Sequence, residues 1–196
     1  MNCHLYHEYM IQNLLSRRNF LVLGGAASLV GMSSSTLSGL IIPEKPKLFQ
    51  KKFALTNIHT GESFEGVFWR NGSWVETSLQ QLNKILRDRR NGKMHRINPG
   101  LFHLMHKIQE EAGTTAQFEI ICGYRSSETN QMLNRTKMGV AKNSQHTKGN
   151  AIDLRLSGIK LASLRDIARG FKAGGVGYYP KSNFVHIDIR PRPDYW

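Results

Sequence analysis

Cysteine is scarce in this sequence. Only Cys3 and Cys122 occur among its 196 residues. Cys3 lies near the start, so a domain that begins after residue 42 cannot form an internal disulfide. Core packing must therefore stabilise that domain, with help from any metal that it binds.

Long apolar runs are absent as well. The weakly apolar stretch from Val22 to Met32 is interrupted by Gly24 and Gly25, and it is too short to span a bilayer well. It follows Arg17-Arg18 within residues 16–21, an arrangement typical of a twin-arginine export signal. We therefore predict that residues 1–42 are such a signal, or an N-terminal membrane anchor if they are not cleaved, and that the protein is periplasmic.

Acidic residues are few, with 14 against 27 lysines and arginines, which gives a formal net charge of +13. Almost all of this charge follows residue 42, and it favours a polyanionic partner. No basic run or recognition-helix signature indicates DNA or RNA, so we predict no nucleic-acid partner. Anionic lipid and cell-wall polymer both fit the charge.

The organisation of the chain indicates one domain. The hydrophobic content of 40% is enough for one ordinary core. Residues 43–52 contain two prolines and four lysines and are predicted to be a linker, which leaves the domain at 53–196. Helical and strand-like segments mix there without a regular βαβ rhythm, which favours an α+β fold with a mainly antiparallel sheet flanked by helices. The expected strands lie in 53–75, 116–122, 151–156 and 183–189, and the expected helices in 76–90, 98–113, 128–138 and 161–171.

Two of the expected strands place polar residues on one face. In 151–156, alternation separates Asp153 from the apolar residues, and in 183–189 it does the same for His186. If these strands are neighbours, Asp153 and His186 lie about 5 Å apart across the ladder, and His146 can approach them from the preceding loop. Two imidazoles and a carboxylate would leave one open position on a tetrahedral zinc ion, which is typical of catalytic sites.

The same residues carry a resemblance to a known family. The run from Ser144 to Asp153 is similar to the S-x-H-x-x-G-x-A-x-D motif of the zinc D-alanyl-D-alanine peptidases of the VanX and VanY type. Residues 123–126 resemble the G-Y-R-S segment of that family, and 174–188 resemble its closing strand. The resemblance implies a fold shared with hedgehog domains, one Zn²⁺ held by His146, Asp153 and His186, and cleavage of peptide cross-links in peptidoglycan.

The resemblance also implies roles for substrate-binding residues. Arg125 matches an arginine that binds the substrate carbonyl or a nearby carboxylate, and a fixed guanidinium suits a developing oxyanion. Its alternative role is a structural salt bridge. Ser144 lies in the matched motif and is a further candidate for binding substrate. Tyr178 and its neighbour Tyr179 precede the ligand strand, where one of them lines the cleft or both serve packing.

The general base departs from the VanX and VanY pattern. Those enzymes have a glutamate three residues before the second histidine, where this sequence has Asn183. Asp188 shares a strand face with His186, so it is the catalytic candidate for accepting a proton. It could equally orient His186.

Two other groups of residues are weaker candidates. His103 and His106 share a helix face, but no third ligand lies near them in the sequence. Cys122 is better explained as a small buried residue than as a nucleophile.

Taken together, these observations predict a monomeric, periplasmic zinc endopeptidase that acts on peptidoglycan stem peptides. Two alternatives stay open at this point. One is a carboxypeptidase that trims terminal D-alanine, and the other is a non-catalytic zinc or wall-binding module.

Overall fold

The computed structural model describes residues 49–136 and 140–196. The predicted export signal at 1–42 and most of the predicted linker lie outside these residues. The first strand begins at Gln50, three residues before the predicted start of the domain. In the part of the chain that the structure describes, no helix is long and apolar enough to cross a bilayer.

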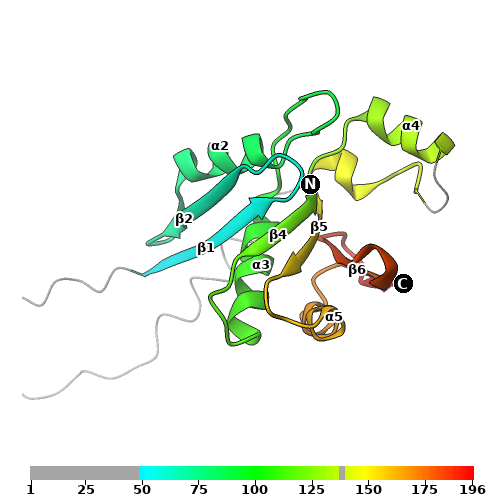
Figure 1. The fold of residues 1–196 in the computed structure, drawn as a ribbon. Coiled ribbons are helices and arrows are strands. Elements are labelled where there is room, and N and C mark those ends of the chain that lie inside the picture. The colour runs from blue at the N-terminus through cyan, green and yellow to red at the C-terminus, as the bar shows by residue number, and fades with distance from the viewer. Residues whose placement is uncertain (1–48, 137–139) are drawn as a thin grey trace, which may run out of the picture. The chain divides into compact units, whose positions relative to one another are not determined.

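The strands form a single sheet (Figure 1). Their order is β3-β2-β1-β4-β5-β7-β6-β8, and only the β1–β4 and β6–β8 pairs are parallel. The predicted α+β fold with a mainly antiparallel sheet is therefore confirmed. The strands are β1 Gln50–Asn57, β2 Ser63–Arg70, β3 Ser73–Trp74, β4 Phe118–Cys122, β5 Ala151–Leu156, β6 Gly175–Tyr179, β7 Phe184–Asp188 and β8 Asp194–Tyr195.

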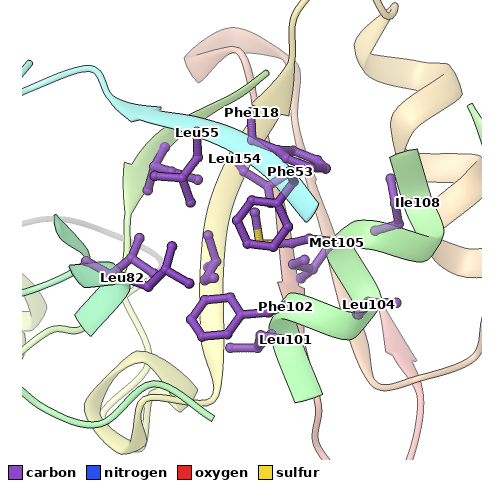
Figure 2. Packing of buried hydrophobic residues seen from close by; sticks show 14 of the residues in the cluster. Phe53, Leu55, Leu82, Leu101, Phe102, Leu104, Met105, Ile108, Phe118 and Leu154 are labelled. Carbon is purple, nitrogen blue, oxygen red and sulfur yellow. The ribbon is translucent and has the colours of Figure 1, made fainter. Parts of the chain in front are cut away.

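The described helices, except the one at 127–136, contribute to one hydrophobic core against the sheet. They are α2 Glu76–Ile85, α3 Pro99–Glu111, α4 Ser127–Thr136 and α5 Leu161–Gly170, with 3-10 turns η1 Gln145–Lys148 and η2 Pro180–Ser182. Figure 2 shows Phe102 and Met105 of α3 directed toward Phe53 of β1, and the rings of Phe53 and Phe102 are 6.0 Å apart. Leu164 of α5 and Leu82 of α2 belong to the same core.

Helix boundaries follow local chemistry. The Asn98 side chain accepts a hydrogen bond from the Gly100 amide at 3.0 Å, and Pro99 occupies the first turn, so α3 begins where the sequence predicts. In contrast, α2 ends at Ile85, five residues before the predicted end at 90. The cause is Asp88, whose carboxylate accepts hydrogen bonds from the amides of Arg90 and Ser126 and fixes a turn instead.

The register of the central strands determines where the site lies. Asp153 on β5 pairs directly with His186 on β7, as alternation and strand adjacency predicted. On the other side of β5, a bulge in β4 places Cys122 opposite Asp153. The core residues Ile152 and Leu154 point to the opposite face of β5. One face of the sheet centre therefore carries polar groups while the other closes the core.

Candidate metal centre

His146 reaches the sheet from the η1 turn. Ser144 caps this turn, because its hydroxyl accepts a hydrogen bond from the His146 amide at 3.3 Å. The turn ends at Gly149, which has a φ of 67° and lies against the Arg96 carbonyl, so a side chain there would be both strained and crowded. These two residues hold His146 over the strand pair.

The three predicted ligands converge on one point. His146 Nε2 lies 3.2 Å from Asp153 Oδ1 and 3.2 Å from His186 Nδ1. His186 Nδ1 and Asp153 Oδ1 are 2.8 Å apart. Donors on a tetrahedral zinc ion with bonds near 2.0 Å are separated by about 3.3 Å. The triangle of donor atoms therefore fits a single such ion, with a contraction along one edge.

Hydrogen bonds fix the tautomers of both imidazoles. His146 Nδ1 lies 2.7 Å from the Gly123 carbonyl, which can only accept, so Nδ1 carries the hydrogen. His186 Nε2 lies 3.1 Å from Asp188 Oδ2 and donates to that carboxylate. The lone pairs of His146 Nε2 and His186 Nδ1 are thereby directed at the same point, which is how outer partners orient metal ligands.

Asp188 lies on the side of the His186 ring away from the donor triangle. Its side chain is fully buried. It accepts further hydrogen bonds from the Gly175 amide at 2.7 Å and the Arg190 guanidinium at 2.6 Å. Burial raises the pKa of Asp188, but the bonds from His186 and Arg190 outweigh burial and hold that pKa well below its usual range. This geometry favours the orienting role over the role of proton acceptor.

Without a metal, the ligands form a buried ion pair. Burial lowers the pKa of His146, but the charges and hydrogen bonds of Asp153 and Cys122 together raise it to about 10. The contact with His146 lowers the pKa of Asp153 despite burial, which raises it. A metal ion that binds here must therefore displace a proton from His146.

Cys122 lies closer to this centre than the sequence indicated. Its sulfur, His146 and Asp153 offer ligand atoms within 4.8 Å of one another, so the thiol is an alternative third ligand to His186. Burial raises the pKa of Cys122, but the charge and hydrogen bond of His146 and the charge of Arg125 together make the net shift downward. Only the β4 bulge brings the thiol there, and sequence alternation gives no sign of a bulge.

Arg125 lies in the loop between β4 and α4, beside the metal ligands. Its amide donates to the His146 carbonyl at 3.2 Å. Its guanidinium contacts Asn130 Oδ1 at 3.3 Å and Cys122 Sγ at 3.6 Å, while Nε is buried without a partner. Among the residues described, no carboxylate forms an ion pair with Arg125. This leaves the guanidinium available to an anionic group of a ligand.

The structure distinguishes the two neighbouring tyrosines, which the sequence could not. Tyr178 does not line the cleft, because its ring packs on the Arg165 guanidinium at 4.6 Å and on the core. Tyr179 lines the cleft instead, since it shares a strand face with Gly177, the partner of His186. Asn183 has a φ of 54°, a left-handed turn conformation that asparagine tolerates.

The pair His103 and His106 shows no sign of a second metal site. His103 Nδ1 is 3.3 Å from the Lys51 ammonium, and burial followed by Lys51 lowers the pKa of His103 to about 4. His106 instead lies 3.4 Å from Glu110. In residues 49–136 and 140–196, no third ligand joins the two histidines.

The centre opens into a cleft of about 570 Å³. Besides the metal ligands and Arg125, its walls include residues that the sequence did not single out. They come from distant segments, and neither their spacing nor their type signals that they meet. They are His59, Arg89, Arg90, Phe184 and Trp196.

The fold and the centre together fit a metal-dependent peptidase of the group that the sequence resembles. Comparison with known proteins narrows this class. The family described as peptidoglycan L,D-endopeptidase MepK matches residues 47–195, and the chain belongs to that family.

Individual relatives agree with that assignment. The chain is 40% identical over 176 residues to peptidoglycan L,D-endopeptidase MepK of Escherichia coli strain K12, covering 90% of this chain and 94% of the relative. The protein of that name from Shigella flexneri matches to the same extent. A probable peptidoglycan L,D-endopeptidase MepK of Haemophilus influenzae is 39% identical over 185 residues, covering 94% of this chain and 96% of the relative. No solved structure matches the chain.

Proposed function

We propose that this protein is a zinc-dependent endopeptidase that hydrolyses peptide cross-links of peptidoglycan outside the cytoplasm. The observation that carries the proposal is the triangle of His146 Nε2, Asp153 Oδ1 and His186 Nδ1 at the floor of an open cleft. Family membership supports the substrate, because the relatives are named for cleaving peptidoglycan. Their names also favour an L,D-type bond.

Each residue of the centre has a part in this chemistry. The three donors would hold one zinc ion, which when bound acts as a Lewis acid and lowers the pKa of a water molecule bound to it. Asp188 orients His186 through the bond to Nε2, as a positioning residue. Arg125 binds the substrate carbonyl and stabilises negative charge that develops on its oxygen. Ser144 acts mainly by capping the turn that carries His146.

The location and domain organisation belong to the same proposal. Residues 1–42 would direct export by the twin-arginine route, and 53–196 would form the peptidase domain after a short linker. An uncleaved leader would tether the domain to the membrane. The excess of basic residues then favours contact with an anionic wall polymer, and we expect the domain to act as a monomer.

Purified sacculi test the proposal. Zinc-loaded protein should release fragments and reduce the cross-linked dimers that chromatography of the digested wall detects, whereas His186→Ala protein should release none. Shortening of monomers without loss of dimers would instead indicate a carboxypeptidase. Binding to sacculi without any cleavage would indicate a non-catalytic module and would contradict the proposal.

A further inference from the structure

The cleft has a cationic flank on the β4 side of the metal centre. His59 follows β1 and lies beside Ile121 of β4, and Arg89 and Arg90 follow α2. Burial lowers the pKa of His59, and the nearby charges of Arg89 and Arg90 lower it further. The three side chains therefore lie close enough to interact electrostatically. The segments are far apart in the sequence, so the fold has brought the two arginines and the imidazole together.

Arg89 and Arg90 supply the positive charge of this flank, because the lowered pKa leaves the His59 imidazole largely neutral near pH 7. Among the residues described, no carboxylate forms an ion pair with His59, Arg89 or Arg90. Arg190 on the opposite flank differs, because it is paired with Asp188 and Asp194. Two exposed arginines without an ion-pair partner on the wall of a cleft favour an anionic part of the ligand.

The backbone that carries the arginines is fixed relative to Arg125. The buried Asp88 carboxylate accepts hydrogen bonds from the Arg90 amide at 3.0 Å and from the Ser126 amide at 2.9 Å. The same side chain therefore holds the turn of the cationic flank and the loop of Arg125. This arrangement sets the spacing between the two positive groups in advance of binding.

The other flank of the cleft is aromatic. Trp196 lies against the His186 ring with centroids 5.3 Å apart, and its indole nitrogen donates to the Tyr179 hydroxyl at 2.7 Å. Tyr179 stacks on Phe184 with ring centroids 4.6 Å apart. Gly177 makes room for the indole, because a Cβ there would lie 2.6 Å from its nitrogen. The sheet order places this wall on the β6 side, with β5 and β7 between it and the cationic flank.

We propose that the cleft selects peptides with a free carboxylate on the β4 side of the scissile bond, bound by His59, Arg89 and Arg90, and an uncharged portion on the aromatic β6 side. This inference rests on the proposed function and adds the polarity with which the substrate lies across the metal centre. The ligand class is an acidic peptide, which fits stem peptides that carry free carboxylates. Arg125 remains the contact of the scissile carbonyl.

A pair of peptides tests this selection. Both contain the cross-link, and they differ only in whether the carboxylates away from the scissile bond are free or converted to carboxamides. The double variant Arg89→Gln/Arg90→Gln is compared with unsubstituted zinc-loaded full-length protein. Arg70→Gln is the matched control, because Arg70 is exposed at the end of β2 and does not line the cleft.

The proposal predicts a loss that is restricted to one peptide. The double variant should raise KM for the carboxylate peptide about tenfold and change kcat less than about twofold, because two exposed charge contacts are lost. It should not change KM for the carboxamide peptide, and added salt should reduce the difference. Trp196→Ala, in contrast, should raise KM for both peptides.

Two results would overturn the selection. One is an unchanged KM for the carboxylate peptide in the double variant, and the other is an equal loss for both peptides. Calorimetric binding of the two peptides separates this proposal from the proposed function. If the unsubstituted protein cleaves neither peptide, the enzymatic function fails. The cationic flank is still supported if the unsubstituted protein binds the carboxylate peptide more tightly than the carboxamide peptide and the double variant loses this preference. Equal binding of both forms contradicts it.

Discussion

At the residue scale, the outer partners of the two histidines matter as much as the donor atoms. Gly123 O and Asp188 Oδ2 each bind the ring nitrogen that faces away from the centre. Each imidazole is therefore held in one tautomer and one orientation. Cys122 stands beside the same centre, where its sulfur has long contacts with Gly123 O and Arg125.

Replacement of Cys122 tests which side chain completes the ligand set. Cys122→Ser should retain one zinc ion per chain and activity within about twofold, because the three donors already form the triangle. His186→Ala should lose the metal. Zinc content after dialysis and the rate of cross-link hydrolysis check both variants. Loss of zinc in Cys122→Ser with retention in His186→Ala would assign the third position to the thiol.

Asp188→Asn tests the orienting role. The amide cannot carry the charge that stabilises the His186 tautomer, so zinc affinity should fall about 10- to 100-fold. At saturating zinc, much of the activity should return, because the variant retains every donor atom. Competition with a metal chelator measures the affinity. Normal zinc affinity with abolished turnover would instead indicate that Asp188 accepts a proton.

The acid stability of the metal-free protein follows from its buried carboxylates. Asp153 and Asp188 have pKa values below the ordinary range. Their contribution is present above the unfolded pKa of about 3.9 and is lost as pH falls below it. Asp188→Asn should cost about 3 kcal/mol at pH 7, because it leaves Arg190 without its buried partner, and the difference from the unsubstituted protein should narrow toward pH 3.

Urea unfolding at both pH values measures this effect. Asp166→Asn is the control, because Asp166 is exposed and pairs only with Arg165 on the surface. That variant should follow the unsubstituted protein at every pH. A constant difference between Asp188→Asn and the unsubstituted protein from pH 7 to pH 3 would contradict the assignment.

At the element scale, the site depends on two antiparallel strands and one short turn. The β5–β7 register brings Asp153 opposite His186, while η1 supplies His146 from above. The η1 turn is a short 3-10 helix, so its conformation depends on the cap at Ser144 and the left-handed residue at Gly149.

Gly149→Ala tests that dependence. Both Gly149 and Gly158 have positive φ, but only Gly149 lies against backbone, at Arg96. Gly158→Ala should cost about 1 kcal/mol for the backbone conformation alone. Gly149→Ala should cost about 3 kcal/mol and weaken zinc binding, because the added methyl also displaces the turn. Equal costs for the two variants, measured by urea unfolding, would show that the contact with Arg96 does not matter.

The same elements show why part of the site was predictable. In each of the two strands the apolar residues alternate with the polar ones and must face the core, so alternation assigns Asp153 and His186 to the polar faces. The interval between His146 and Asp153 is short enough for a local motif. Cys122 escaped this reasoning because a bulge shifts it by one position, and the choice between Tyr178 and Tyr179 needed a strand register that the sequence does not give.

At the scale of the whole molecule, the cleft combines segments that no local pattern connects. Arg89 and Trp196 lie more than one hundred positions apart in the sequence and reach opposite flanks of one metal centre only through the sheet order. The core of large apolar side chains on the other face of the sheet fixes that order without any disulfide in the described residues. The proposed substrate selection is therefore a property of the assembled fold, whereas the proposed metal ligands belong to two strands and a turn.

The most direct test of this account is hydrolysis of purified cross-linked muropeptide dimers by metal-stripped protein before and after one equivalent of zinc is restored. Zinc-dependent catalysis at this centre predicts no cleavage without metal, conversion of dimers to monomers once zinc is added, and no recovery in His146→Ala, Asp153→Ala or His186→Ala. Cleavage that persists in the metal-stripped protein, or zinc binding without any cleavage of dimers, would contradict it.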